Sequence, residues 1–135
     1  MSLTVSDVHV GTKLPELQIY GDPTFIVSTA IATRDYQDVH HDRDKAHAKG
    51  SKDIFVNILT DTGLVQRFIT DWAGPAARIK TIGLRLGVPW YAYDTITFTG
   101  EVTEIEGDLV TLKVVGSNSL GNHVIATSTL TLGDN

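Results

Sequence analysis

The sequence predicts an α+β fold in which one long helix covers one face of a five-stranded antiparallel sheet. Three observations lead to this prediction. Apolar residues recur at helical spacing over residues 54–72, most of the chain after Pro75 is β-branched or alternating, and a further β-branched run occupies residues 24–32. A strand, a long helix and four more strands can bury the apolar side of the helix only against the sheet.

The N-terminal part divides into a lead-in and a first strand. Residues 1–23 contain turn-forming residues without sustained periodicity, namely Gly11, Pro15, Gly21 and Pro23. We therefore expect a loosely structured lead-in there. The segment TFIVSTAIA at residues 24–32 favours a strand, and the polar residues 34–41 favour a loop. A chain of 135 residues is too short for two ordinary domains, so one domain is expected over residues 24–135.

Two helices are expected next. Asp42 is a suitable N-cap for a short helix over residues 43–48. The long helix over residues 54–72 contains Gly63, which costs about 1 kcal/mol relative to Ala in a helix interior. We therefore expect Gly63 to lie where the helix packs most closely on the sheet.

The remainder of the chain is predicted to form four strands. Turn signals separate segments of β-branched residues at residues 93–94, 106–108 and 120–122. The predicted strands span residues 78–88, 95–105, 109–117 and 123–132.

Composition excludes several classes of function. The chain contains no cysteine, which excludes disulfides, thiolate metal sites and a cysteine nucleophile. A formal net charge of -5 argues against a nucleic-acid-binding surface, which needs clustered Lys and Arg. No segment approaches the roughly 20 apolar residues of a membrane-spanning helix. The N-terminus lacks the pattern of a signal peptide, so a cytoplasmic location is expected.

Asp35 and His40 are the first candidates for catalysis. They lie in one polar loop, where a carboxylate and an imidazole can converge on one water molecule as a general acid/base pair. A turn-forming Asp and an unrelated surface His would give the same spacing. The spacing alone leaves both interpretations open.

Two further clusters admit other functions. Nitrogen and oxygen ligand types gather at His40, His41, Asp42, Asp44 and His47, but the strands beyond offer only His123, so we expect no metal site. Basic residues that could meet the phosphates of a cofactor, or simply form a solvated helix face, are Arg43, Lys45, Lys49 and Lys52.

The ordering of these residues resembles the MaoC-like (R)-specific enoyl-CoA hydratases. Their motif runs Gly-Asp-any-Asn-Pro-aliphatic-His, followed after five residues by a small residue. The matching positions are Asp35, Val39, His40 and Ala46. The sequence departs from the motif at Arg34, which replaces the Gly, and at Gln37-Asp38, which replace Asn-Pro.

The resemblance implies a hot-dog fold and a hydratase mechanism. Asp35 and His40 would be the catalytic pair, and the backbone amide of Asn57, at the entry to the central helix, would stabilise an oxyanion. The substrate would be an acyl-CoA thioester, with CoA as part of the substrate and no metal or redox cofactor. The partner would be a second MaoC-like hot-dog subunit in a hetero-oligomer, or a second copy in a homodimer.

Three segments carry a narrower resemblance, to the small subunits of heteromeric enoyl-CoA hydratases in steroid side-chain degradation by actinobacteria. They read DVHHDRDKA, GSKDIFVNILTDTGLVQR and LGVPWYAYDT. This likeness implies a steroid-derived enoyl-CoA as substrate. Two alternatives remain open: a hot-dog thioesterase that uses Asp61 to activate water, and a non-catalytic acyl-CoA-binding or scaffold subunit.

Overall fold

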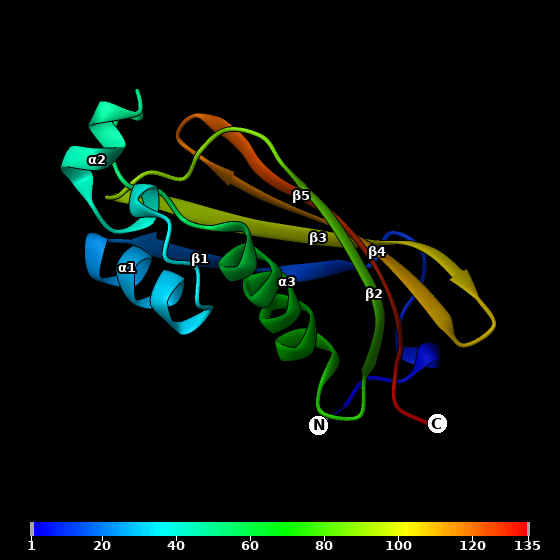
Figure 1. Ribbon diagram of the computed structural model, residues 1–135. Coiled ribbons are helices and arrows are strands. Elements are labelled where there is room, and N and C mark those ends of the chain that lie inside the picture. Colours follow the sequence, from blue (N-terminus) through cyan, green and yellow to red (C-terminus); the bar gives the residue numbers. More distant parts are fainter. Residues whose placement is uncertain (1, 135) are drawn as a thin grey trace.

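The computed structural model describes residues 2–134, which form one sheet with helices on one side (Figure 1). The elements in chain order are η1 Val5–Asp7, β1 Lys13–Gly21, α1 Pro23–Ala32, η2 Asp38–His40, α2 Arg43–Ala48, α3 Ile58–Ala73, β2 Arg78–Leu86, β3 Asp94–Glu106, β4 Leu109–Asn118 and β5 Gly121–Thr131.

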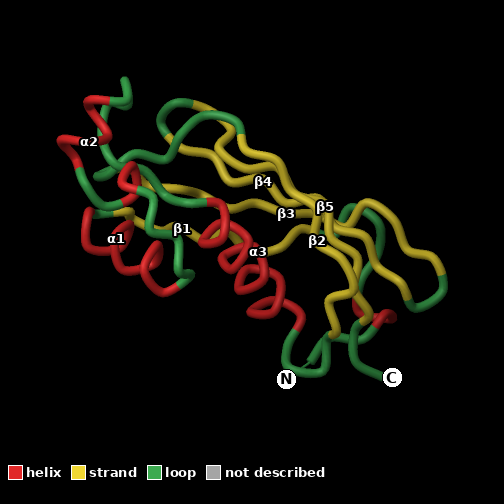
Figure 2. Tube along the Cα trace, in the orientation of Figure 1, coloured by secondary structure: helices red, strands yellow, loops and turns green. Residues whose placement is uncertain are grey.

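The sheet has five strands in the order β1-β3-β4-β5-β2, and all its pairings are antiparallel. The long helix α3 lies across one face, and α1 and α2 lie beyond the N-terminal end of α3 (Figures 1 and 2). The predicted architecture, a long helix on a five-stranded antiparallel sheet, is therefore confirmed. The four strands predicted after Pro75 are β2 to β5.

The first strand was predicted in the wrong place, because the segment of residues 24–32 is helix α1. The helix starts with an Asp-Pro pair: the Asp22 side chain accepts a hydrogen bond from the Phe25 backbone N–H at 2.8 Å, and Pro23 occupies the first helical turn. Both are strong helix-start signals. Burial of Ile26 and Ala30 then stabilises a helix despite the β-branched composition.

The prediction of a loosely structured lead-in is also wrong, since Lys13–Gly21 forms β1 and pairs with β3. The prediction was wrong because Pro15 was interpreted as a residue that interrupts a strand. It lies on an edge strand, where the register shifts between Leu14 and Leu17. A proline is tolerated at such a site, because no ladder hydrogen bond requires its missing N–H.

Helix α3 covers the sheet with an apolar face. Its residues Val65, Phe68, Ile69 and Ala73 are buried in the same core as the inward side chains of β3, β4 and β5. The helix begins at Ile58 rather than at residue 54, and Gly74 ends it with a φ of 88°. No helix in the described residues is long and apolar enough to cross a membrane.

Gly63 does not mark the close approach between helix and sheet. It is exposed, and a Cβ added there would meet nothing within 4 Å. The close approach lies at Gly100 of β3, where a Cβ would stand 2.9 Å from Cε2 of Phe68. The Phe68 ring is itself packed against Phe98, with ring centroids 5.9 Å apart. The strand therefore supplies the small residue that the contact needs.

A buried Asp–His pair fastens the first turns of α3 to β5. The Nε2 atom of His123 lies 2.9 and 2.8 Å from the two carboxyl oxygens of Asp61, and neither residue is more than 2% exposed. The Nδ1 atom lies 2.7 Å from the carbonyl oxygen of Val88, which can only accept a hydrogen bond. Nδ1 therefore carries a proton, and a second proton is shared between Nε2 and Asp61.

This environment shifts both pKa values. Burial raises the pKa of Asp61, and the hydrogen bond and charge of His123 offset only part of that effect. Burial by itself would lower the pKa of His123, but the hydrogen bond to Asp61, the charge of Asp61 and the Val88 carbonyl together raise it. The folded protein therefore holds the shared proton more tightly than the unfolded chain does.

The two glycines should respond to alanine in opposite directions. Gly63→Ala should raise the free energy of unfolding by about 0.5–1 kcal/mol, because the site is helical and open. Gly100→Ala should lower it by about 1–3 kcal/mol, because the new methyl group displaces Phe68. Urea denaturation of both variants measures the two effects. Equal effects would contradict the assignment of the close contact to Gly100.

Asp61→Asn should change how stability depends on pH. The Asn amide can donate to Nε2 of a neutral His123, so the variant keeps a hydrogen bond without a titrating proton. Because the pKa of His123 is raised in the folded state, the stabilisation that the shared proton gives is complete below the ordinary His pKa of 6.5 and is lost as the pH rises through the higher folded pKa. Urea denaturation should show wild type losing stability relative to the variant between about pH 6 and pH 9. A difference that stays constant over that range would rule out the shared proton.

Candidate active site

Asp35 is placed by the C-terminal end of α1. The Thr33 hydroxyl donates to the Thr29 carbonyl at 2.8 Å, and Arg34 turns the chain with a φ of 59°. The Asp35 backbone N–H then donates to the Ala30 carbonyl at 2.9 Å. These local bonds anchor the loop to the helix, so the position of the Asp35 carboxylate follows from where α1 packs.

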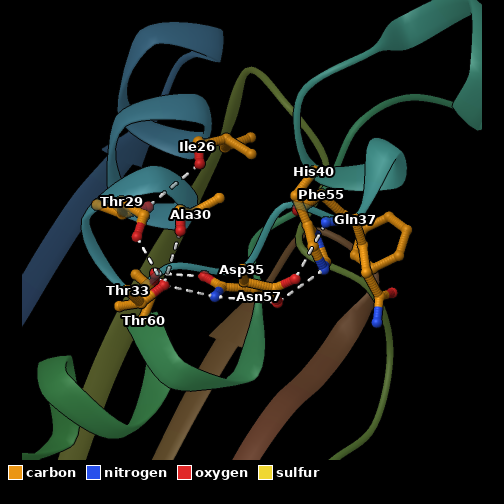
Figure 3. Close-up of polar contacts among 10 residues, drawn as sticks. All are labelled: Ile26, Thr29, Ala30, Thr33, Asp35, Gln37, His40, Phe55, Asn57 and Thr60. Carbon is orange, nitrogen blue, oxygen red and sulfur yellow. Dashed lines mark hydrogen bonds and ion pairs between the residues drawn. The ribbon is translucent and has the colours of Figure 1, made fainter.

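His40 ends η2, and its imidazole is buried. Nδ1 lies 2.7 Å from the Phe55 carbonyl oxygen, which can only accept, so the Nδ1–H group donates a hydrogen bond to that oxygen. The Phe55 ring packs against the imidazole, with centroids 4.9 Å apart and planes at 83°. Both contacts orient the ring so that Nε2 points to Asp35, at 3.4 Å from Oδ2. Figure 3 shows the two side chains facing each other.

Asn57 immediately precedes α3 and completes the cluster. Its Nδ2 atom donates to Thr33 Oγ1 at 2.9 Å and to Asp35 Oδ2 at 3.2 Å (Figure 3). Its Oδ1 atom accepts a hydrogen bond from the hydroxyl of Thr60, in the first turn of the helix. The structure thus brings together Asp35 from the loop after α1, His40 from η2, and Asn57 from the position just before α3.

The sequence indicated Asn57 only for its backbone amide, and it did not indicate Thr33 or Thr60 at all. The Asn57 side chain is 1% exposed and engages a carboxylate, which makes it part of the polar cluster. An Asn before a helix is usually interpreted as a cap, and nothing in the local sequence distinguishes that role from this one. Only the packing of α1 against α3 places Thr33 within reach.

The geometry is suited to acid/base chemistry on a bound water. Asp35 keeps 18% of its side chain exposed and His40 7%, so a carboxylate and an imidazole nitrogen lie side by side at the edge of the protein interior. Next to them, the first backbone N–H groups of α3 lack intrahelical acceptors and carry partial positive charge. A proton acceptor, an orienting imidazole and an anion-stabilising helix end therefore adjoin one another.

Several of the other candidate residues have partners away from Asp35 and His40. His47 faces the Lys52 carbonyl through Nε2 at 2.9 Å, and residues 2–134 hold no group of three or more potential metal-binding side chains. Two of the basic residues are paired: Lys49 with Asp38 at 2.5 Å and Arg43 with Asp53 at 3.5 Å.

Asp61, the candidate base of a thioesterase, is not placed for that role. Its carboxylate is fully buried and held by His123, so it has no open side from which to activate water. Asp61 does lie in the first turn of α3, but its carboxylate is buried rather than exposed.

Comparison with known proteins finds one relative of high sequence identity, which is named as a hydratase subunit. No family model matches the chain. The chain is 75% identical over 125 residues to the 3-oxo-4,17-pregnadiene-20-carboxyl-CoA hydratase beta subunit of Mycobacterium tuberculosis, covering 93% of this chain and 97% of that protein. A chain of the crystallised ChsH1–ChsH2 complex from Mycobacterium tuberculosis superposes with a TM-score of 0.91 at 75% identity, covering 92% of this chain and 98% of that one.

More distant structures share the fold. The (R)-hydratase from A. caviae involved in PHA biosynthesis superposes with a TM-score of 0.87 at 18% identity, covering 95% of this chain and 99% of that one. A MaoC-like dehydratase superposes with a TM-score of 0.89 at 20% identity, covering 98% of this chain and 43% of that one. Identities this low support the fold alone. The fold is therefore the hot-dog fold, and the identity to the mycobacterial beta subunit places the chain in the MaoC-like enoyl-CoA hydratase family.

Proposed function

We propose that this chain is the Asp35- and His40-bearing subunit of an enoyl-CoA hydratase, which adds water to the double bond of an α,β-unsaturated acyl-CoA. The observation that carries the proposal is the approach of Asp35 Oδ2 to His40 Nε2, 3.4 Å apart, beside the N-terminus of α3. Identity to a hydratase subunit supports the reaction type.

In the proposed mechanism, water lies between the acid/base pair and the β-carbon of the substrate. Asp35 accepts a proton as the water oxygen bonds to the β-carbon, and His40 orients that water through Nε2. The pair then delivers a proton to the α-carbon. One water has been added, the thioester bond is intact, and the pair has returned to its starting protonation state.

The start of α3 stabilises the charge that develops during this step. Electron density moves from the double bond toward the thioester oxygen, which gains enolate character. The backbone N–H of Asn57 would donate a hydrogen bond to that oxygen, and the partial positive charge of the helix end would stabilise the negative charge on it. Because these donors are fixed by the fold, they need no reorganisation during the reaction.

The relatives support a specific substrate and partner. The beta subunit to which the chain is 75% identical is named for a steroid-derived carboxyl-CoA, and the matching crystal structure is a complex of two proteins. We therefore propose a steroid side-chain enoyl-CoA as substrate and a second MaoC-like hot-dog subunit as partner. Exposed apolar side chains lie next to Asp35 and Asn57 in the sequence, namely Tyr36, Ile58 and Leu59. Such side chains could contact an apolar acyl group or a partner subunit.

The proposed reaction uses no metal or redox cofactor, because hydration changes no net oxidation state and Asp35 and His40 provide the proton transfers. CoA enters as part of the substrate. We place the reaction in the cytoplasm, since CoA thioesters are intracellular metabolites.

Asp35→Asn and His40→Ala, made separately in the assembled complex, should each reduce kcat by about 10²–10⁴-fold. Asn keeps the size of Asp35 but removes the base, and Ala removes the imidazole. The double variant should be little worse than the poorer single variant, because the two groups act together. Loss of the enoyl-thioester absorbance measures hydration.

The matched control is Asp44→Asn, an exposed carboxylate on the nearby helix α2, which should leave kcat unchanged. A thiol reagent detects free CoA and would reveal a thioesterase, because hydration releases none. Near-wild-type hydration by both Asp35→Asn and His40→Ala would assign the chemistry to the partner and leave this chain as a scaffold.

A further inference from the structure

We propose that the Asn57 side chain is a positioning residue that holds the Asp35 carboxylate toward His40, with the Thr60 hydroxyl fixing the Asn57 amide. This inference rests on the proposed function, because it assumes that Asp35 is the base. It concerns the side chain of Asn57 and is independent of the backbone amide.

The first argument is that Asn57 occupies a capping position without capping. An Asn before a helix ordinarily turns its side-chain oxygen to the N–H of the second or third helical residue. Here no such hydrogen bond forms. The oxygen accepts instead from Thr60, and the amide nitrogen is directed away from the helix, to Asp35 and Thr33. The helix gives up its side-chain cap, and the loop that carries Asp35 gains two hydrogen bonds.

The second argument is that the amide can have only one orientation. The Thr33 hydroxyl donates to the Thr29 carbonyl at 2.8 Å, so toward Asn57 it can only accept. The ionised carboxylate of Asp35 also accepts only. Both of these neighbours require the nitrogen of Asn57, which leaves the oxygen for the Thr60 hydroxyl. A flipped amide would bring its oxygen against two acceptors in a site that is nearly closed to water.

The third argument concerns the carboxylate itself. Its two oxygens have different partners: Oδ1 accepts from the Gln37 backbone N–H at 3.3 Å, and Oδ2 accepts from Asn57 at 3.2 Å. Rotation of the carboxylate would break both bonds. Oδ2 is also the oxygen that faces His40, so the hydrogen bond from Asn57 fixes the orientation in which the carboxylate faces His40. The same side chain therefore links the start of α3 to the acid/base pair.

The test uses Asn57→Asp and Asn57→Ala in the assembled complex. Both variants keep the backbone N–H, and Asp also keeps the shape of the side chain but removes the donor. We expect kcat to fall by about 10- to 100-fold with KM changed by less than about threefold, because orientation of the base acts on the chemical step. Wild-type kcat in both variants would overturn the inference.

A double-variant cycle separates positioning from general structural support. If Asn57 acts through the Asp35 carboxylate, Asn57→Ala should cost less than about twofold in an Asp35→Asn background. A loss of the same size in both backgrounds would mean that Asn57 supports the fold rather than the base, and would overturn the inference. If Asp35→Asn itself retained hydration, the proposed function would fail instead.

The Thr60 hydroxyl offers a second route that leaves Asn57 in place. Thr60→Ser keeps the hydroxyl and should keep kcat within about twofold, whereas Thr60→Val keeps the shape and should lower kcat, because the amide is no longer fixed. Thr70→Val, which removes an exposed hydroxyl farther along the same helix, is the matched control and should leave kcat unchanged. Equal kcat for Thr60→Ser and Thr60→Val would contradict the role of the hydroxyl.

Discussion

The first turns of helix α3 are the constraint on which the structure depends. A helix start carries backbone donors without intrahelical partners, and here it lies against the protein interior, where polar groups need partners. Two sets of side chains hold this helix start in place from different sides, and neither of them caps its backbone N–H groups. Asn57 and Thr60 engage the loop that carries Asp35, and Asp61 engages His123 on β5. These contacts connect the start of α3 both to the loop that carries Asp35 and to the sheet. The position of the helix therefore fixes the site relative to the sheet.

This arrangement shows how the fold holds the two candidate catalytic side chains, Asp35 and His40, in a fixed geometry. Asp35 and His40 are not placed mainly by contact with each other, since 3.4 Å is a long approach. Each is held by a backbone group of another segment: Asp35 by the Ala30 carbonyl and His40 by the Phe55 carbonyl. Such tethers leave the reactive atoms with free bonding capacity. A carboxylate oxygen and an imidazole nitrogen can then share a water molecule, which a tight direct ion pair would exclude.

The sheet explains why such a chain would act in an assembly. Its two edge strands, β1 and β2, each have one partner strand within the described residues. Side chains beside the site in the sequence, including Ile58 and Leu59, are about half exposed although they are apolar. A hot-dog domain that pairs with a second subunit would cover such surfaces. The polar cluster of Asp35, His40 and Asn57 is itself built from side chains of this chain.

The sequence by itself determined what local rules encode: the four C-terminal strands, the Asp42-capped helix α2, the long helix and, through a family motif, Asp35 and His40. Periodicity, capping residues and turn residues can each be recognised within a short segment of the sequence. Residues 24–32 formed a helix against their β-branched composition, because the Asp22-Pro23 start and burial on α3 outweigh strand propensity. Only the tertiary structure decided that Gly100 rather than Gly63 meets the helix, that Asp61 pairs with His123, and that the Asn57 side chain turns to Asp35. These contacts join residues far apart in the chain, and their energies arise from burial and geometry that exist only once helix and sheet have packed.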